Sequence, residues 1–227
     1  MIPIGDDDSG RTRTPWVTYL LIALNVLVFF VEITRPSEAQ LQSFFEKWAV
    51  VPLEYAQKVD LPPQAPGPFW ITLLTSLFLH GGWMHLIGNM LYLWIFGDNV
   101  EDRWGHAKYL FVYLVCGLVA SMAHIMFNLS SKIPSLGASG AISGILGAYL
   151  VLFPKNRIRI LSRMGVVHVP ALVVLGFWIV LQVLSQASAA GEATGVAYWA
   201  HIGGFLAGVI FAFLFGRRNV GTMRPAM

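Results

Sequence analysis

The sequence has few charged residues and a single cysteine. Only 12% of its 227 residues are charged, whereas soluble domains carry about 25%. Hydrophobic residues make up 56%, and the mean hydropathy is +0.63. This composition excludes an ordinary soluble domain and indicates one membrane domain. The one cysteine, Cys116, lies in an apolar run. A single cysteine excludes a disulfide framework and a thiolate metal site.

The sequence also lacks features of secreted and of nucleic-acid-binding proteins. No short basic region leads into a cleavable apolar segment, so we expect residues 1–15 to be a cytoplasmic tail rather than a signal peptide. The net charge of +3 is small. Nucleic-acid-binding proteins cluster basic residues on a polar face, and this sequence offers no such face, so no nucleic-acid partner is expected.

Long apolar stretches are what the sequence does contain, and a bilayer crossing needs ~20 such residues. We predict an all-α membrane protein whose membrane domain covers residues 16–216, followed by a C-terminal cytoplasmic tail over 217–227. A charged loop is expected at 101–103 and a basic turn at 154–159. The six expected spans are 16–33, 83–96, 109–127, 139–153, 166–184 and 198–215.

A long outer loop is expected over residues 35–69. Its segment 38–48 spaces apolar groups helically, which predicts an amphipathic helix lying on the membrane surface. Four prolines between 62 and 68 then interrupt helical structure. Residues 70–79 are apolar and predicted to be helical, ending at His80-Gly81-Gly82.

The lysines and arginines predict the orientation. Placing the N-terminus inside puts eleven of them in inner segments and only four in outer ones, namely Arg35, Lys47, Lys58 and Lys132. Because basic residues concentrate in cytoplasmic segments, both termini are expected to be cytoplasmic. We expect an integral membrane protein of a bacterial-type plasma membrane.

Ser139 and His201 are the candidate catalytic pair. From each of them an apolar span continues for 14 residue steps, to Phe153 and to Phe215, or about 21 Å of helix. Both side chains should therefore lie at the same depth, roughly 9 Å below the outer boundary of a ~30 Å hydrocarbon core. Non-helical backbone at that depth must be buried in protein or line a wet cavity. A water-filled pocket open to the outer side is expected.

The chemistry of these residues suits acyl transfer. Ser139 is a weak nucleophile until a base removes its proton, and His201 is suited to be that base. We expect a dyad, with no carboxylate from the outer half of a span completing a triad. His85 and Asn89 lie four residues apart on one face of the second span. Together with the Ser139 backbone N–H, they are candidate donors to an oxyanion.

Glycines surround both candidate residues. Gly137 and Gly140 let the backbone turn and approach a substrate closely. Gly204 and Gly208 form a G-x-x-x-G motif, which is typical of closely packed membrane helices. One interpretation is that this face meets Gly140 and Gly144 of the fourth span. The alternative is generic packing or exposure to lipid.

These motifs together resemble the rhomboid intramembrane serine proteases over about residues 70–215. The resemblance rests on Gly137-Ala138-Ser139-Gly140, His201 with Gly204 and Gly208, His85-x-x-x-Asn89 and Gly97-x-x-x-Glu101-x-x-x-Gly105. It implies a six-span rhomboid-like fold, Ser139 as nucleophile, His201 as general base, and an oxyanion hole made by His85, Asn89 and the Ser139 amide. It further implies single-pass membrane protein substrates, cut near the outer face and often after a small residue.

The sequence departs from the family at two places. The Trp-Arg pair that many members carry before the second span is absent, since Ile71 follows Trp70. Ser143 stands where some members have an aromatic residue that stacks on the base. The orientation of the His201 ring is therefore left open.

Two other classes of function stay open. One is a catalytically silent relative that binds membrane clients, although such proteins usually lack the serine or the histidine. The other is a metal or proton transporter using His80, His85 and His201. His80 and His85 should diverge on a helix because they are five residues apart, and no H-E-x-x-H motif occurs. No metal or cofactor is expected, and the substrate and oligomeric state are left open.

Overall fold

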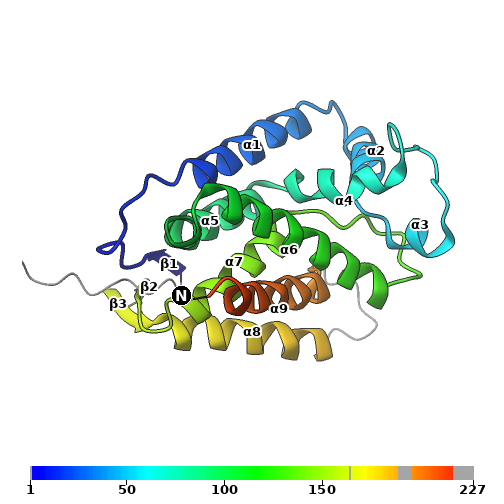
Figure 1. Cartoon of the computed structure of the whole chain (residues 1–227). Helices are drawn as coiled ribbons and strands as arrows, with labels where there is room; N and C mark the ends of the chain where they lie inside the picture. Colours follow the sequence, from blue (N-terminus) through cyan, green and yellow to red (C-terminus); the bar gives the residue numbers. More distant parts are fainter. Residues whose placement is uncertain (1, 164, 189–195, 217–227) are drawn as a thin grey trace, which may run out of the picture.

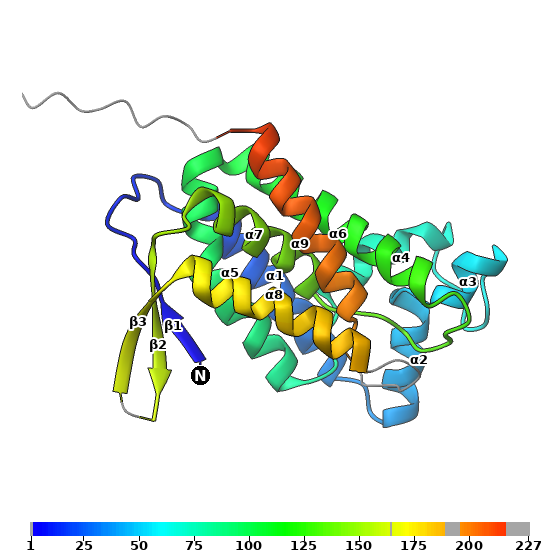
Figure 2. The ribbon, with the colours of Figure 1, turned by 90° about the horizontal axis from the view of Figure 1, so that it is seen from below.

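The computed structural model describes residues 2–163, 165–188 and 196–216, and most of them are helical. Figure 1 shows a body of helices with a small sheet at one end, and Figure 2 shows the strands extending away from that body. The expected C-terminal tail, 217–227, lies outside the described residues.

Several described helices are suited to a membrane by length and hydropathy. Three are long and apolar enough to cross it, and a bent pair of helical segments with a 79° break is a further candidate. Two more are apolar but shorter. The three long helices are α1 (Trp16–Ile33), α6 (His106–Phe127) and α8 (Ala171–Ser188). The bent pair consists of the helical segments within Phe69–Phe78 and of α5 (Trp83–Trp104). The two shorter helices are α7 (Ser139–Leu152) and α9 (Tyr198–Leu214).

The expected outer loop contains further helical segments. The helix expected at 38–48 is present as α2 (Glu38–Trp48), and its start is capped by Ser37. A short α3 (Pro52–Gln57) follows. The apolar helix expected at 70–79 is instead split into η1 (Phe69–Ile71), α4 (Thr72–Thr75) and η2 (Ser76–Phe78).

The prediction that the second span stops near Gly97 and leads into a charged loop at 101–103 is wrong. Helix α5 continues to Trp104. The carboxylate of Glu101 is buried, and it accepts hydrogen bonds of 2.8 Å from the backbone N–H groups of Val17 and Thr18. These donors lack acceptors within α1 because they lie in its first turn. Glu101 is thus tolerated inside α5 because its carboxylate caps the start of the neighbouring helix α1.

The basic turn expected at 154–159 and the fifth span expected from 166 are also wrong in their bounds. Residues from both form strands β2 (Arg157–Ser162) and β3 (Gly165–Pro170), and α8 begins only at Ala171. In the described part of the chain they belong to a three-stranded antiparallel sheet of order β1-β2-β3. The all-α class therefore holds for the helical body but not for this end.

The first strand comes from the expected N-terminal tail. Strand β1 (Ile2–Gly5) pairs with β2 through Ile2 and Leu161. The next residue, Asp6, is buried, and it accepts hydrogen bonds from Asn99 of α5 and Tyr149 of α7. Burial raises the pKa of Asp6 to about 6, because the charged carboxylate loses its hydration. Residues 2–6 are thus attached to the helical body.

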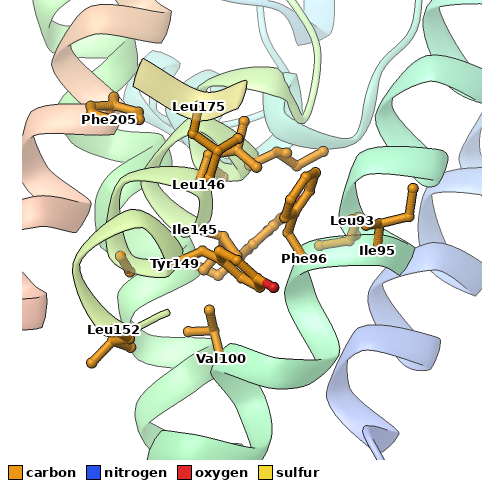
Figure 3. Packing of buried hydrophobic residues seen from close by; sticks show 14 of the residues in the cluster. Leu93, Ile95, Phe96, Val100, Ile145, Leu146, Tyr149, Leu152, Leu175 and Phe205 are labelled. Atoms are coloured by element: carbon orange, nitrogen blue, oxygen red, sulfur yellow. The ribbon is translucent and has the colours of Figure 1, made fainter. Parts of the chain in front are cut away.

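The largest core cluster gathers around α7, which contacts α5, α6, α8 and α9. Its buried side chains interdigitate with those of the surrounding helices, as Figure 3 shows. Between α5 and α7, the ring of Phe96 meets that of Tyr149 edge-on at 5.1 Å. This packing fixes the position of α7, the helix that begins at Ser139.

Helices α7 and α9 approach each other most closely, through glycines. A Cβ on Gly204 would overlap the carbonyl oxygen of Gly140, and a Cβ on Gly208 would overlap that of Gly144. In apolar surroundings no hydrophobic force joins helices, so close backbone contact supplies much of their association. The structure thus places the two glycine pairs at the contact between these helices.

We predict that Gly204→Val destabilises the folded protein, because its side chain must separate α9 from α7. Overpacking of this kind costs about 1–3 kcal/mol. The measurement is thermal unfolding of the purified protein in detergent. Gly176→Val in α8 is the control, since apart from its chain neighbours and the backbone of α8 itself, no heavy atom of the described residues lies within 4 Å of a Cβ there. Equal unfolding temperatures for both variants would contradict the prediction.

Candidate active site

Ser139 and His201 lie side by side at one end of the helical body. Ser139 is the first residue of α7, and His201 lies in the first turn of α9. The Ser139 Oγ is 2.9 Å from the His201 Nε2. This is within the reach needed for proton transfer. The close contact of α7 with α9 brings together two residues that are 62 positions apart.

The loop before Ser139 is held in place by its backbone. Gly137 has φ +125°, a conformation that suits glycine. Its N–H donates a 2.8 Å hydrogen bond to the carbonyl oxygen of Ser76. A Cβ on Gly137 would be 2.8 Å from the His85 Nε2 and 3.6 Å from the Ser139 Oγ. These two side chains therefore border the same space beside Gly137.

His85 and Asn89 present donors to this region. The Gly81 N–H donates to the His85 Nδ1 at 3.3 Å, so in the neutral ring the proton is on Nε2. Asn89 is buried, and its Nδ2 has no hydrogen-bond partner among the described residues. The backbone N–H of Ser139 is a further donor, because N–H groups in the first turn of a helix lack intrahelical acceptors.

Two residues of α8 that the sequence analysis missed contact His201. The His201 Nδ1 lies 2.7 Å from the Gln182 Oε1, and the Trp178 ring lies 5.9 Å from the imidazole, measured between centroids. The sequence did contain an indication that Gln182 belongs to the site, since a polar residue inside an apolar span usually faces the bundle interior. Trp178 lies four residues earlier, on the same helix face.

Ser143, by contrast, does not contact the imidazole in the way an aromatic residue would. Its hydroxyl donates a 2.6 Å hydrogen bond to the carbonyl oxygen of Ser139, within α7. The aromatic ring beside His201 comes from Trp178 on α8 instead. The orientation that the sequence left open is therefore set by contacts from another helix.

His80 lies next to the site but has a different environment. Its ring meets that of His85 edge-on at 5.1 Å, so the expectation that the two side chains diverge is wrong. The reason is that His80 precedes α5 and is not on its helical path. The His80 backbone N–H donates to the carboxylate of Glu32 at 3.0 and 3.2 Å. Glu32, near the C-terminal end of α1, thus binds this loop rather than His201.

A cavity of about 1320 Å³ borders both Ser139 and His201. It lies at the end of the body away from the sheet, between the starts of α5, α7 and α9 and the later parts of α6 and α8. Its described lining contains no Asp, Glu, Lys or Arg. Its titratable side chains, besides His201, are His85, His124, Tyr92 and Tyr198. The cavity is therefore suited to water and to an uncharged, largely apolar ligand.

Comparison with known proteins identifies the family. The rhomboid domain model matches residues 68–218, which include both Ser139 and His201. The chain is 32% identical over 209 residues to the rhomboid protease GluP of Bacillus subtilis, covering 92% of this chain and 36% of that protein. It is 28% identical to rhomboid protein 1, mitochondrial, of Saccharomyces cerevisiae, of which it spans 54%.

A plant relative is matched over more of its length. The chain is 31% identical over 233 residues to RHOMBOID-like protein 6, mitochondrial, of Arabidopsis thaliana, covering 92% of this chain and 72% of that protein. The first two relatives are thus considerably longer than the matched region, whereas this one exceeds it only moderately.

Proposed function

The chain belongs to the rhomboid family, and from this premise we propose that it is an intramembrane serine endopeptidase. Its substrates are the transmembrane segments of single-pass membrane proteins, cut near the outer membrane face. The observation that carries the proposal is the 2.9 Å approach of the Ser139 Oγ to the His201 Nε2, beside a cavity within an apolar helical body.

The proposed topology has six spans with both termini in the cytoplasm. The chain is an integral membrane protein, and its longer apolar helices and bent helical pair support four crossings. We assign the shorter α7 and α9 as the fourth and sixth. The sheet end carries Arg157, Arg159 and Lys155, which supports a cytoplasmic position. The relatives include mitochondrial and plant proteins, so the bacterial-type plasma membrane is part of the proposal.

The first chemical step follows from the placement of the pair. His201 Nε2 removes the hydroxyl proton of Ser139 as the Oγ attacks the carbonyl carbon of the scissile peptide bond. A tetrahedral intermediate forms, and its oxygen carries the negative charge. When the intermediate collapses, the protonated imidazole gives that proton to the leaving amine. The products are an acyl ester on Ser139 and the released carboxy-terminal fragment.

The second step needs water, which the cavity has room to hold. His201 Nε2 takes a proton from a water molecule as its oxygen attacks the ester carbon. Collapse of the second intermediate returns the proton to the Ser139 Oγ and frees the amino-terminal fragment. In both steps the oxyanion is stabilised by N–H donors that are already in place: the Ser139 amide, the His85 ring and the Asn89 side chain.

The substrate class is supported by the lining of the cavity. Among the described residues that line it, none carries a full charge apart from any protonated histidine. An apolar transmembrane segment therefore enters without facing an unpaired charge. A preference for a small residue at the cleavage point is what the family resemblance implies.

The proposal is tested with purified full-length protein in liposomes containing a single-pass membrane protein as substrate. Wild type is expected to cleave it, whereas Ser139→Ala and His201→Ala are expected to be inactive while unfolding at the wild-type temperature. Fragment formation is measured on gels and the cut site by mass spectrometry.

A chelator provides the control in the same assay, because a side-chain nucleophile needs no metal-bound water. Activity should be unchanged. Cleavage by Ser139→Ala would contradict the proposal, as would activity lost in chelator and restored by zinc.

The oxyanion donors give a separate prediction. Removing one such donor typically reduces kcat about 10²–10³-fold. Asn89→Ala and His85→Ala are therefore expected to cleave the same substrate with kcat reduced by about this factor. If both variants turn over at the wild-type rate, these residues have only a packing role.

A further inference from the structure

Gln182 is a polar residue on a helix that is otherwise mostly exposed. The described buried residues of α8 are Ala171 and Leu175, both near its start. Gln182 lies more than a turn beyond them and is half-buried. A polar side chain inside a membrane is energetically costly unless it has a hydrogen-bond partner. Its partner is the imidazole of His201, at 2.7 Å from the Gln182 Oε1.

The direction of this hydrogen bond follows from the role of His201. A base that accepts the Ser139 proton must have a free lone pair on Nε2, which faces the Ser139 Oγ. The proton of the neutral ring is then on Nδ1. Since Nδ1 donates, Gln182 must accept through its side-chain carbonyl, and the observed contact is with that atom.

We propose that Gln182 is a positioning residue that keeps His201 in the tautomer and orientation needed to activate Ser139. This inference rests on the proposed function. Gln182 has the place that a carboxylate has in a Ser-His-Asp triad, but it carries no charge. When the proton moves from Ser139 to His201, the ring becomes positive. Its Nδ1–H bond to the amide oxygen then strengthens, because a charged donor makes a stronger hydrogen bond.

The surroundings of His201 leave this role to Gln182. The other titratable groups that line the cavity are His85 of α5, His124 of α6, Tyr92 of α5 and Tyr198 of α9. In the described part of the chain, no carboxylate hydrogen-bonds to the His201 ring. The nearby Trp178 ring contacts the imidazole but offers no carbonyl acceptor.

The experiment follows the rate at which a fluorophosphonate probe labels Ser139, which needs no knowledge of the substrate. Full-length protein in liposomes is labelled between pH 5 and 9. Gln182→Met keeps the length and removes the acceptor. Gln182→Asn keeps the amide but is too short to reach. Both are expected to label about tenfold more slowly at neutral pH, roughly the effect of one lost hydrogen bond.

Two further variants separate positioning from packing. Val183→Met places the same side chain at the next position of α8, which is exposed, and should label at the wild-type rate. Gln182→Glu should restore labelling and move the acidic limb of its pH profile to higher pH, because a carboxylate stabilises the protonated imidazole. For a cleaved substrate, kcat should fall in Gln182→Met and Gln182→Asn while KM stays unchanged.

The outcomes distinguish this inference from the proposed function. If wild type labels but Gln182→Met and Gln182→Asn label at the same rate and with the same pH profile, Gln182 has no positioning role and the proposed function stands. If the wild-type protein fails to label at Ser139, both are overturned. The inference would also be overturned if the Gln182 variants label more slowly but Val183→Met is slowed by the same factor. That result would indicate a general disturbance of α8.

Discussion

The close contact between α7 and α9 is the constraint on which the rest of the structure depends. The backbone of each helix lies against glycines of the other, at Gly140 with Gly204 and at Gly144 with Gly208. No larger side chain fits there. Because Ser139 begins α7 and His201 lies in the first turn of α9, both at this end of the contact, the distance between the Ser139 Oγ and the His201 Nε2 is set by helix packing. The proposed chemistry therefore needs no flexible loop to bring the two side chains together.

The remaining elements complete the site around this contact. From one side, the start of α5 and the loop before Ser139 bring the His85 ring beside Ser139. From the other side, α8 contacts the His201 ring through Gln182 and Trp178. The cavity lies between these sides, where water and a peptide have room to approach. In a low-dielectric interior, such fixed donors and acceptors interact strongly with developing charge.

Much of this arrangement could be predicted from the sequence, because apolar length and glycine motifs carry strong signals. The helices expected from Trp16, Trp83, Ser139 and Tyr198 begin at these residues. The sheet could not be predicted, since it pairs Ile2 with the distant Leu161. Helix α5 exceeds its expected end because Glu101 caps α1, a tertiary contact that no local pattern reveals. Gln182 was missed because one polar residue in an apolar span does not identify its partner.

The most direct test of an activated serine at this site is the position of a covalent adduct. Full-length protein in liposomes is treated with a fluorophosphonate and digested, and the peptides are mapped by mass spectrometry. The account predicts an adduct on Ser139 in the wild type, and none in His201→Ala. An adduct on another serine, or equal modification of Ser139 without His201, would contradict it.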